Sequence, residues 1–314
     1  MKQPPSALFG PVPSRRLGLS LGIDPLDFKT CSLDCVYCEL GLTTRLTGRR
    51  GRWRDYRQIL TQVKNCLSQM KRIPDSLTVS GSGEPTLHLD LGALLEGLGQ
   101  LSPARRTVIT NSTLLHLPQV RRDLGKADLL MPSLDALSPP VFAALNRPAP
   151  DLNPQKMLRG LMDLRQEFSG PIWLEILLVA GINDQEEELD KLRRAAADLR
   201  PDLVQLNTIV RPPALAAYAP VSAPRLAALA AGFDPPAVVI SPPQAPNSPR
   251  EEAGNEAEDV IIRTVRMRPC TGRDLLNVTG LNRILLQSSL RRLLAQGAIE
   301  IQDYAGRRYY RGKI

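Results

Sequence analysis

Three cysteines lie within eight residues in the segment Cys31-Ser32-Leu33-Asp34-Cys35-Val36-Tyr37-Cys38, at spacings of four and three. A short loop with this spacing can direct three thiolates inward at one small object. Closely spaced thiolates suit a zinc ion or an iron–sulfur cluster. A structural zinc needs four ligands, and Cys66, His88 and His116 are all distant in sequence. Three cysteines would instead leave one iron of a four-iron cluster open. A zinc site completed by a distant residue is the alternative.

The composition is that of an ordinary globular chain. Its 314 residues allow one large domain and a small one. The hydrophobic content is 43% and the charged content 23%. There is no apolar run of the roughly 18 residues that a membrane span needs, and residues 1–16 contain no apolar core of a secretion signal. Five cysteines with a tight triplet fit a reducing compartment. We therefore expect a cytoplasmic protein without a membrane partner.

The positive charge is concentrated at one end of the chain. Residues 259–314 hold eleven Arg and Lys and four Asp and Glu, so +7 of the total charge of +8 lies there. Residues 1–258 carry only +1. This distribution indicates a polyanionic partner for the C-terminal segment, RNA or DNA, and not for the whole surface.

Short apolar segments alternate with helical patterns through most of the chain. The expected strands are 19–24, 76–80, 106–110, 127–132, 172–179 and 203–207. The expected helices are 56–70, 89–100, 114–124, 138–145, 153–168, 184–198 and 222–232. Such alternation predicts an α/β fold with a parallel sheet covered by helices. Residues 9–18, rich in proline and glycine, are expected to form an irregular lead-in.

The end of the chain has a different organisation. We expect a core domain over 1–240, with an edge strand at 238–240, and a stiff linker rich in proline and acidic residues over 241–258. After it come helices at 259–266, 272–278 and 282–296 and strands at 298–303 and 308–311. This order predicts a winged-helix domain over 259–314.

Polar residues follow five successive strands, where parallel βα folds place their ligands. They include Glu84 in the segment 80–86, Asn111, Asp135, Asp184 and Arg211. We expect them to line one rim together with the cysteine loop.

The cysteine spacing, the aromatic Tyr37 before the last cysteine, and Ser82-Gly83-Glu84 together resemble the radical S-adenosylmethionine (radical SAM) superfamily. The resemblance implies an open (β/α)6 partial barrel. It also implies one [4Fe–4S] cluster held by Cys31, Cys35 and Cys38, whose open iron takes S-adenosylmethionine (SAM). The cofactor-binding residues that it implies are Tyr37, Ser82, Gly83, Glu84, Asn111, Ser133, Asp135 and Val179. Ser82 stands where the family motif has glycine.

The resemblance further implies a reductive mechanism. An electron from a low-potential donor of the flavodoxin or ferredoxin type enters the cluster and cleaves SAM. The resulting 5′-deoxyadenosyl radical removes hydrogen from an unactivated carbon of the substrate. The catalytic residues that act on the substrate are not identified by the sequence.

Residues 9–213 look like a narrower group that contains the archaeal wyosine (tRNA) synthetases and their uncharacterised bacterial relatives. Those enzymes carry further cysteines for a second cluster, whereas only Cys66 and Cys270 remain here. A second cluster is therefore not expected, and the resemblance does not extend to wyosine chemistry itself.

Three functions stay open on the sequence. The first is a radical SAM enzyme that modifies RNA, supported by the charge of 259–314 and by the basic, aromatic loop 45–57. The second modifies a protein or peptide docked by the winged helix. The third is a DNA-binding regulator that senses its cluster or SAM.

Overall fold

The computed structural model describes residues 6–14, 16–234, 236–240 and 255–313. A curved parallel sheet forms its centre, in two hydrogen-bonded parts. The first part contains β2 (Gly18–Ile23), β5 (Ser76–Val79), β6 (Arg105–Thr110) and β7 (Leu129–Pro132). The second contains β8 (Trp173–Leu178) and β9 (Leu203–Thr208). Isolated parallel bridges from Leu130 to Ile172 and from Ser133 to Glu175 join β7 to β8. The predicted α/β partial barrel is confirmed.

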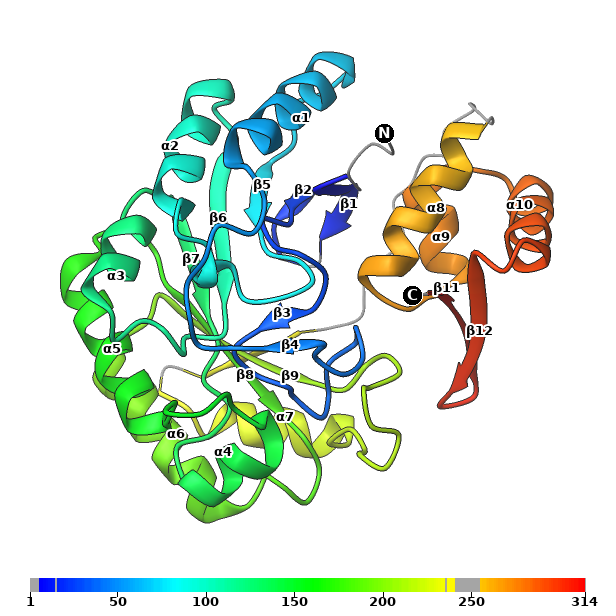
Figure 1. Ribbon diagram of the computed structural model, residues 1–314. Helices are drawn as coiled ribbons and strands as arrows, with labels where there is room; N and C mark the ends of the chain where they lie inside the picture. The colour runs from blue at the N-terminus through cyan, green and yellow to red at the C-terminus, as the bar shows by residue number, and fades with distance from the viewer. Residues whose placement is uncertain (1–5, 15, 235, 241–254, 314) are drawn as a thin grey trace.

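The helices lie in an arc along the outside of the strands (Figure 1). They are α1 (Tyr56–Gln69), α2 (Leu91–Leu101), α3 (Pro118–Leu124), α4 (Pro139–Asn146), α5 (Pro154–Glu167), α6 (Glu186–Leu199) and α7 (Ala223–Ala231). Local signals set several starts: the side chains of Asp55 and Asn153 cap α1 and α5. Helix α3 begins at Pro118, later than the predicted residue 114, because proline favours the first helical turn.

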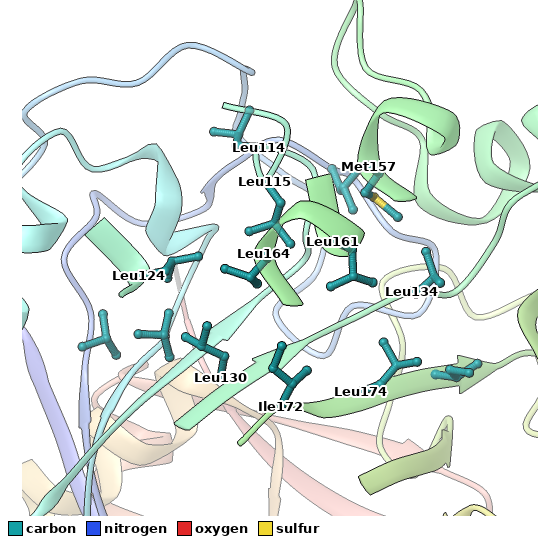
Figure 2. Packing of buried hydrophobic residues seen from close by; sticks show 14 of the residues in the cluster. Leu114, Leu115, Leu124, Leu130, Leu134, Met157, Leu161, Leu164, Ile172 and Leu174 are labelled. Atoms are coloured by element: carbon teal, nitrogen blue, oxygen red, sulfur yellow. The ribbon is translucent and has the colours of Figure 1, made fainter. Parts of the chain in front are cut away.

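The core lies between the strands and these helices. Figure 2 shows Met157, Leu161 and Leu164 on α5 pointing at Leu130 on β7 and at Leu174 on β8. All five side chains are buried. Burial of such side chains contributes about 1.5–3 kcal/mol each, so this layer holds the strands in place and leaves their carboxyl ends open for the site.

The expectation of an irregular lead-in at residues 9–18 is wrong. Residues Leu8–Ser14 form β1, which pairs antiparallel with β2, with an irregularity between Phe9 and Val12. Strand β2 would otherwise present an unpaired edge, and proline is tolerated in an edge strand. At the opposite end, β10 (Val238–Val239) pairs parallel with β9, as the edge strand expected there.

The C-terminal module, residues 255–313, has a core of its own. It consists of α8 (Asn255–Met267), β11 (Cys270–Thr271), α9 (Gly272–Thr279), α10 (Arg283–Ala295), β12 (Ile299–Tyr304) and β13 (Arg307–Gly312). Its sheet has the order β11-β13-β12. Ile261, Leu275 and Leu290 are among its buried residues. The expected helices and strands are present, and the winged-helix assignment stays a prediction. Residues 241–254 of the expected linker lie outside the described residues. Helix α8 begins at Asn255, four residues before the predicted start at 259 and therefore inside the range expected for the linker.

The module packs against the core and is not held away from it. Helix α8 lies against β1, where Figure 1 shows the module beside the open side of the sheet. The Tyr309 hydroxyl donates a hydrogen bond to the carbonyl oxygen of Val210 at 3.2 Å. Arg311 lies so close to the cysteine loop that a Cβ on Gly41 would be 2.7 Å from its Nη2. No local pattern in the sequence indicates these contacts.

Within the part of the chain that the structure describes, no helix is both long and apolar enough to cross a membrane.

Candidate active site

The cysteine loop starts on the short strand β3 (Thr30–Cys31) and returns through β4 (Arg45–Leu46). Its middle is fixed by the end of α4. The Asp34 amide donates to the carbonyl oxygen of Asn146 at 3.0 Å, and the Val36 amide donates to that of Leu145 at 3.0 Å. Leu33 and Val36 are buried. The apolar side chains therefore point into the core, which frees the cysteines to face the rim.

Each of the three cysteine sulfurs has an N–H donor from a side chain. Lys29 Nζ lies 3.0 Å from Cys38 Sγ, and Asn111 Nδ2 lies 3.6 Å from Cys31 Sγ. Asn146 Nδ2 lies 3.4 Å from Cys35 Sγ. Donors of this kind stabilise thiolates and tune the potential of an iron–sulfur cluster. The donor set therefore fits a thiolate-bound cluster.

Burial raises the pKa of the Cys31 thiol to about 12 and also raises that of Cys35. A metal that coordinates a thiol removes its proton outright. Thiolates at this position are thus expected only with a bound metal. Among the described residues, no group of three or more His, Cys, Asp and Glu side chains is arranged to hold a single metal ion. A cluster needs no such group, because each thiolate binds a different iron.

Glu84 follows β5 and is almost fully buried, with 2% of its surface exposed. Its Oε1 accepts hydrogen bonds from the Thr86 amide at 3.0 Å and from the Thr86 and Thr110 hydroxyls, each at 2.6 Å. Its Oε2 accepts one from the Asn111 amide at 2.6 Å. Burial raises the pKa of Glu84, and these donors lower it. A carboxylate offers about four lone-pair sites, so Oε2 retains capacity for one more donor.

The residues just before Glu84 support the cysteine loop. The amide and hydroxyl of Ser82 donate to Asp24 Oδ2 at 3.1 and 2.6 Å. A Cβ on Gly83 would lie 1.7 Å from the carbonyl oxygen of Thr30, so only glycine fits there. Thr30 directly precedes Cys31, and its carbonyl accepts the Glu84 amide at 3.2 Å. The Ser82-Gly83-Glu84 loop therefore sits directly behind the first cysteine.

Tyr37, Asp135 and Asn146 form a buried network beside Cys35. The Tyr37 hydroxyl donates to Asp135 Oδ2, and Asn146 Nδ2 lies 3.2 Å from the same oxygen. Asp135 Oδ1 accepts the Leu177 amide at 2.9 Å. Burial raises the pKa of both Tyr37 and Asp135. The network ties the cysteine loop to β7, α4 and β8 at once.

The other predicted residues sit on the same rim. The amide of Ser133, at the end of β7, donates to the Thr110 carbonyl at 2.9 Å. Asn111 Nδ2 donates to Ser32 Oγ at 2.9 Å. Val179 is buried after β8, and its amide donates to Asn183 Oδ1 at 2.8 Å. The expectation of a shared rim is met, but most of these side chains bond to the protein.

A cavity of about 370 Å³ opens in front of this rim; we call it the inner cavity. Of the predicted site residues, Tyr37 and Cys38 line it. Its wall also includes Ser80, Gly81 and Ile109 from the ends of β5 and β6. The other predicted site residues are not part of its lining.

Two charged residues in the inner cavity form a pair, of which the sequence analysis did not predict Glu175. Arg16 forms a salt bridge with Glu175, which points inward from β8. Arg16 Nη1 also lies 3.2 Å from Gln205 Oε1 on β9. Glu175 is the single acidic residue in the apolar segment 172–179, and this isolated charge is the sequence feature that could have identified it as a site residue. A charge at an inward position of a buried strand indicates a functional or structural polar pair.

The C-terminal module supplies one wall of the inner cavity, through Thr264, Met267 and Arg268. Arg211 is buried at this boundary and pairs with Glu39, next to Cys38, at 3.3 Å. The sequence analysis missed this wall, because nothing in the sequence of α8 shows what it packs against.

Comparison with known proteins agrees with this geometry. The family model "Radical SAM superfamily" matches residues 27–192, which span the cysteine loop and most of the strands described above. The chain therefore belongs to the radical SAM superfamily, whose members use a [4Fe–4S] cluster and SAM.

Several relatives share the core region. A protein of Brachyspira hyodysenteriae named GTPase Obg is 41% identical over 65% of this chain and 30% of its own length. A UPF0026 protein of Synechocystis is 36% identical over 66% of this chain and 76% of its own length. One of Methanocaldococcus jannaschii is 35% identical over 65% and 64%. The chain thus spans less than a third of the first of these proteins and under two thirds of the last.

Two solved structures share the fold. One is TYW1 with a lysine-pyruvate adduct, with a TM-score of 0.51, 18% identity, and coverage of 69% of this chain and 74% of that one. The other is a radical SAM methyltransferase from Sphaerobacter thermophilus, with a TM-score of 0.51, 20% identity, and coverage of 70% and 65%.

Proposed function

We propose that this radical SAM enzyme acts on RNA and that its C-terminal module holds the RNA beside the reaction site. The observation that carries the proposal is the position of the module. Residues 259–314, which contain all but the first four residues of the module, bear a net charge of +7, and the module walls the inner cavity. A positive surface at the mouth of a reaction cavity suits a polyanionic substrate.

We assign the cluster to Cys31, Cys35 and Cys38. The support is their spacing and the N–H donors from Lys29, Asn111 and Asn146 that surround their sulfurs. The bound cluster and SAM supply the reducing chemistry that starts a radical reaction. The protein orients these groups and keeps water away from them. Cys66 and Cys270 are left out of the assignment, because Cys66 lies in α1 and Cys270 is buried in the C-terminal module.

We assign SAM to the rim beside the cysteine loop. Tyr37 lines the inner cavity and offers an aromatic surface to the adenine. Glu84 Oε2 accepts one hydrogen bond and so keeps a lone pair for the amino group of SAM, and Ser82 and Gly83 shape the loop that carries Glu84. Asn111, Ser133, Asp135 and Val179 complete the proposed binding set. Asp135 acts by holding the Tyr37 hydroxyl, a positioning role that its hydrogen bonds support.

A low-potential donor of the flavodoxin or ferredoxin type is the proposed electron source. The five cysteines of the chain are all free thiols, which fits a reducing cytoplasm.

A protein or peptide substrate is the second candidate, and one observation favours it. Ile284 and Leu285 on α10 are 79% and 40% exposed, next to the exposed Arg283. Helical spacing predicts Leu285 on the buried apolar face with Leu286 and Leu290, but the side chain of Leu285 is exposed, so this prediction is wrong. Exposed apolar residues flanked by arginine are typical of protein docking surfaces.

The experiment that tests the proposal uses anaerobically purified protein with a reconstituted cluster, SAM and reductant. It compares the formation of 5′-deoxyadenosine with total tRNA, with DNA and with protein fractions. Stimulation by tRNA supports the RNA function. Stimulation by a protein fraction alone, or by none of the three, contradicts it.

A further inference from the structure

A second cavity of about 460 Å³ lies between the amino-terminal strand and the C-terminal module; we call it the outer cavity. The outer cavity adjoins the inner cavity, since Phe9 and Met267 line both of them. Helix α8 therefore forms a wall of both cavities. Nothing in the proposed reaction uses the outer cavity.

The walls of the outer cavity carry more positive than negative charge. Four cations line it, Arg54, Arg263, Arg266 and Lys313, against two carboxyl groups, Asp24 and Asp259. Asp24 is buried and accepts a hydrogen bond from the Ser82 hydroxyl at 2.6 Å. Burial raises the pKa of Asp24, and the positive charge of Arg54 lowers it. The core side of the cavity is thus electrically balanced.

The C-terminal side of the outer cavity is not balanced. Arg263, Arg266 and Lys313 are exposed. None of these three cations takes part in a salt bridge with any residue that the structure describes. Among the described residues that line this side, Asp259 is the one acidic residue that opposes them. Three available cations in one hollow form a binding surface for an anion with more than one charged group.

The mixture of cations and apolar side chains in the outer cavity favours a nucleic acid strand over a small inorganic anion. Arg263 and Arg266 stand three residues apart on α8, which places neighbouring side chains on one face of a helix. Phe28 and Ile262 add half-buried apolar surface within the same cavity. Cations along a groove with an aromatic ring inside it are the features that bind a single-stranded nucleic acid.

We propose that the outer cavity binds the phosphodiester backbone of single-stranded RNA and leads it past Phe9 and Met267 toward the inner cavity. This inference rests on the proposed RNA function and adds the path of the strand. Arg263 and Arg266 are the phosphate contacts that it requires, and Phe28 is the surface on which a base stacks.

The test measures binding of a fluorescein-labelled oligouridine to full-length, cluster-loaded protein over a range of salt concentrations. The variant is Arg263→Gln with Arg266→Gln, which keeps the side-chain stems that pack on the module. The matched control is Arg159→Gln with Arg194→Gln, the same charge change at exposed positions on α5 and α6. Iron content and thermal melting verify that both variants are folded, and Lys313→Gln serves as a second cavity variant.

Each single-strand phosphate contact contributes about 0.7 to the slope of log K against log salt. The Arg263/Arg266 variant should therefore lower the slope by about 1.4, while the control pair leaves it unchanged. Equal losses in both pairs, or none in the cavity variants, would overturn the inference and leave the RNA function standing. If the wild-type protein binds neither oligouridine nor tRNA, the RNA function and the inference both fail.

Discussion

The Tyr309 hydroxyl donates a hydrogen bond to the carbonyl oxygen of Val210, across the boundary between the C-terminal module and the barrel. Val210 directly precedes Arg211, which pairs with Glu39 beside the last cysteine of the loop. One short path of contacts therefore links the module to the proposed cluster site.

Replacement of Cys31, Cys35 or Cys38 by Ala should abolish cluster assembly, because each thiolate is assigned to a different iron. Reconstituted wild-type protein should contain about four irons per chain. The Cys66→Ala variant is the control and should keep its iron, since Cys66 lies in α1. Iron near eight per chain, or zinc without iron, would contradict the assignment.

The Glu84→Gln variant should bind SAM about tenfold more weakly while the cluster still assembles. A charge-assisted hydrogen bond to the amino group of SAM is worth about 1.5–3 kcal/mol. The carboxylate of Glu84 accepts hydrogen bonds from Thr86, Thr110 and Asn111. The side-chain amide of glutamine would turn its own N–H groups toward some of these donors. Equilibrium binding of SAM to reconstituted protein measures the effect. Thr86→Val, which removes one of these donors, is the control for a general loosening of the loop. Equal losses of affinity in both variants would place the amino group elsewhere.

Asn146→Ala should lower the reduction potential of the cluster. The N–H group of Asn146 faces Cys35 Sγ at 3.4 Å and stabilises the reduced, more negative cluster. A redox titration followed by electron paramagnetic resonance gives the potential. Asn153→Ala is the control, because Asn153 caps α5 away from the sulfurs. An unchanged or raised potential in Asn146→Ala would argue against a hydrogen bond to the cluster ligand.

Arg211→Met should destabilise the folded protein by about 2 kcal/mol, since a hydrogen bond to a charged group contributes about 1.5–3 kcal/mol. Arg211 is buried between the barrel and the module, where it pairs with Glu39 at 3.3 Å. Denaturant unfolding of the full-length protein measures the loss. Arg72→Met is the control, because its pair with Asp75 is exposed. If the two variants lose the same stability, the buried pair does not hold the module.

Arg283→Gln with Arg291→Gln should weaken tRNA binding and reduce its salt dependence. Both arginines are exposed on α10 and, with Gln287 between them, share one face. Each lost duplex contact lowers the slope of log K against log salt by about 0.9. Fluorescence anisotropy with labelled tRNA gives the slope, and the Arg159/Arg194 pair is again the control. A slope equal to that of wild type would exclude α10 from the RNA surface.

Local features of the sequence determined the elements and the chemistry of this protein. Cysteine spacing, the alternation of apolar strands with helices, and the charge of 259–314 each act over short distances along the chain. Those features predicted a parallel sheet covered by helices and the rim at the carboxyl ends of the strands, and the resemblance to the radical SAM superfamily implied the partial barrel and its cofactors. They also predicted Glu84 and Asn111 as neighbours, which their hydrogen bond confirms.

Only the tertiary structure decided which side chains face the cavity. Glu84 and Asp135 are turned toward protein donors, because burial of a carboxylate requires hydrogen-bond partners. The strand β1 and the position of α8 depend on pairing and packing between segments far apart in the chain. Such contacts leave no local pattern, since they are set by which surfaces remain exposed after the barrel has formed. For this reason the wall formed by Thr264, Met267 and Arg268, and the outer cavity behind it, could be found only in three dimensions.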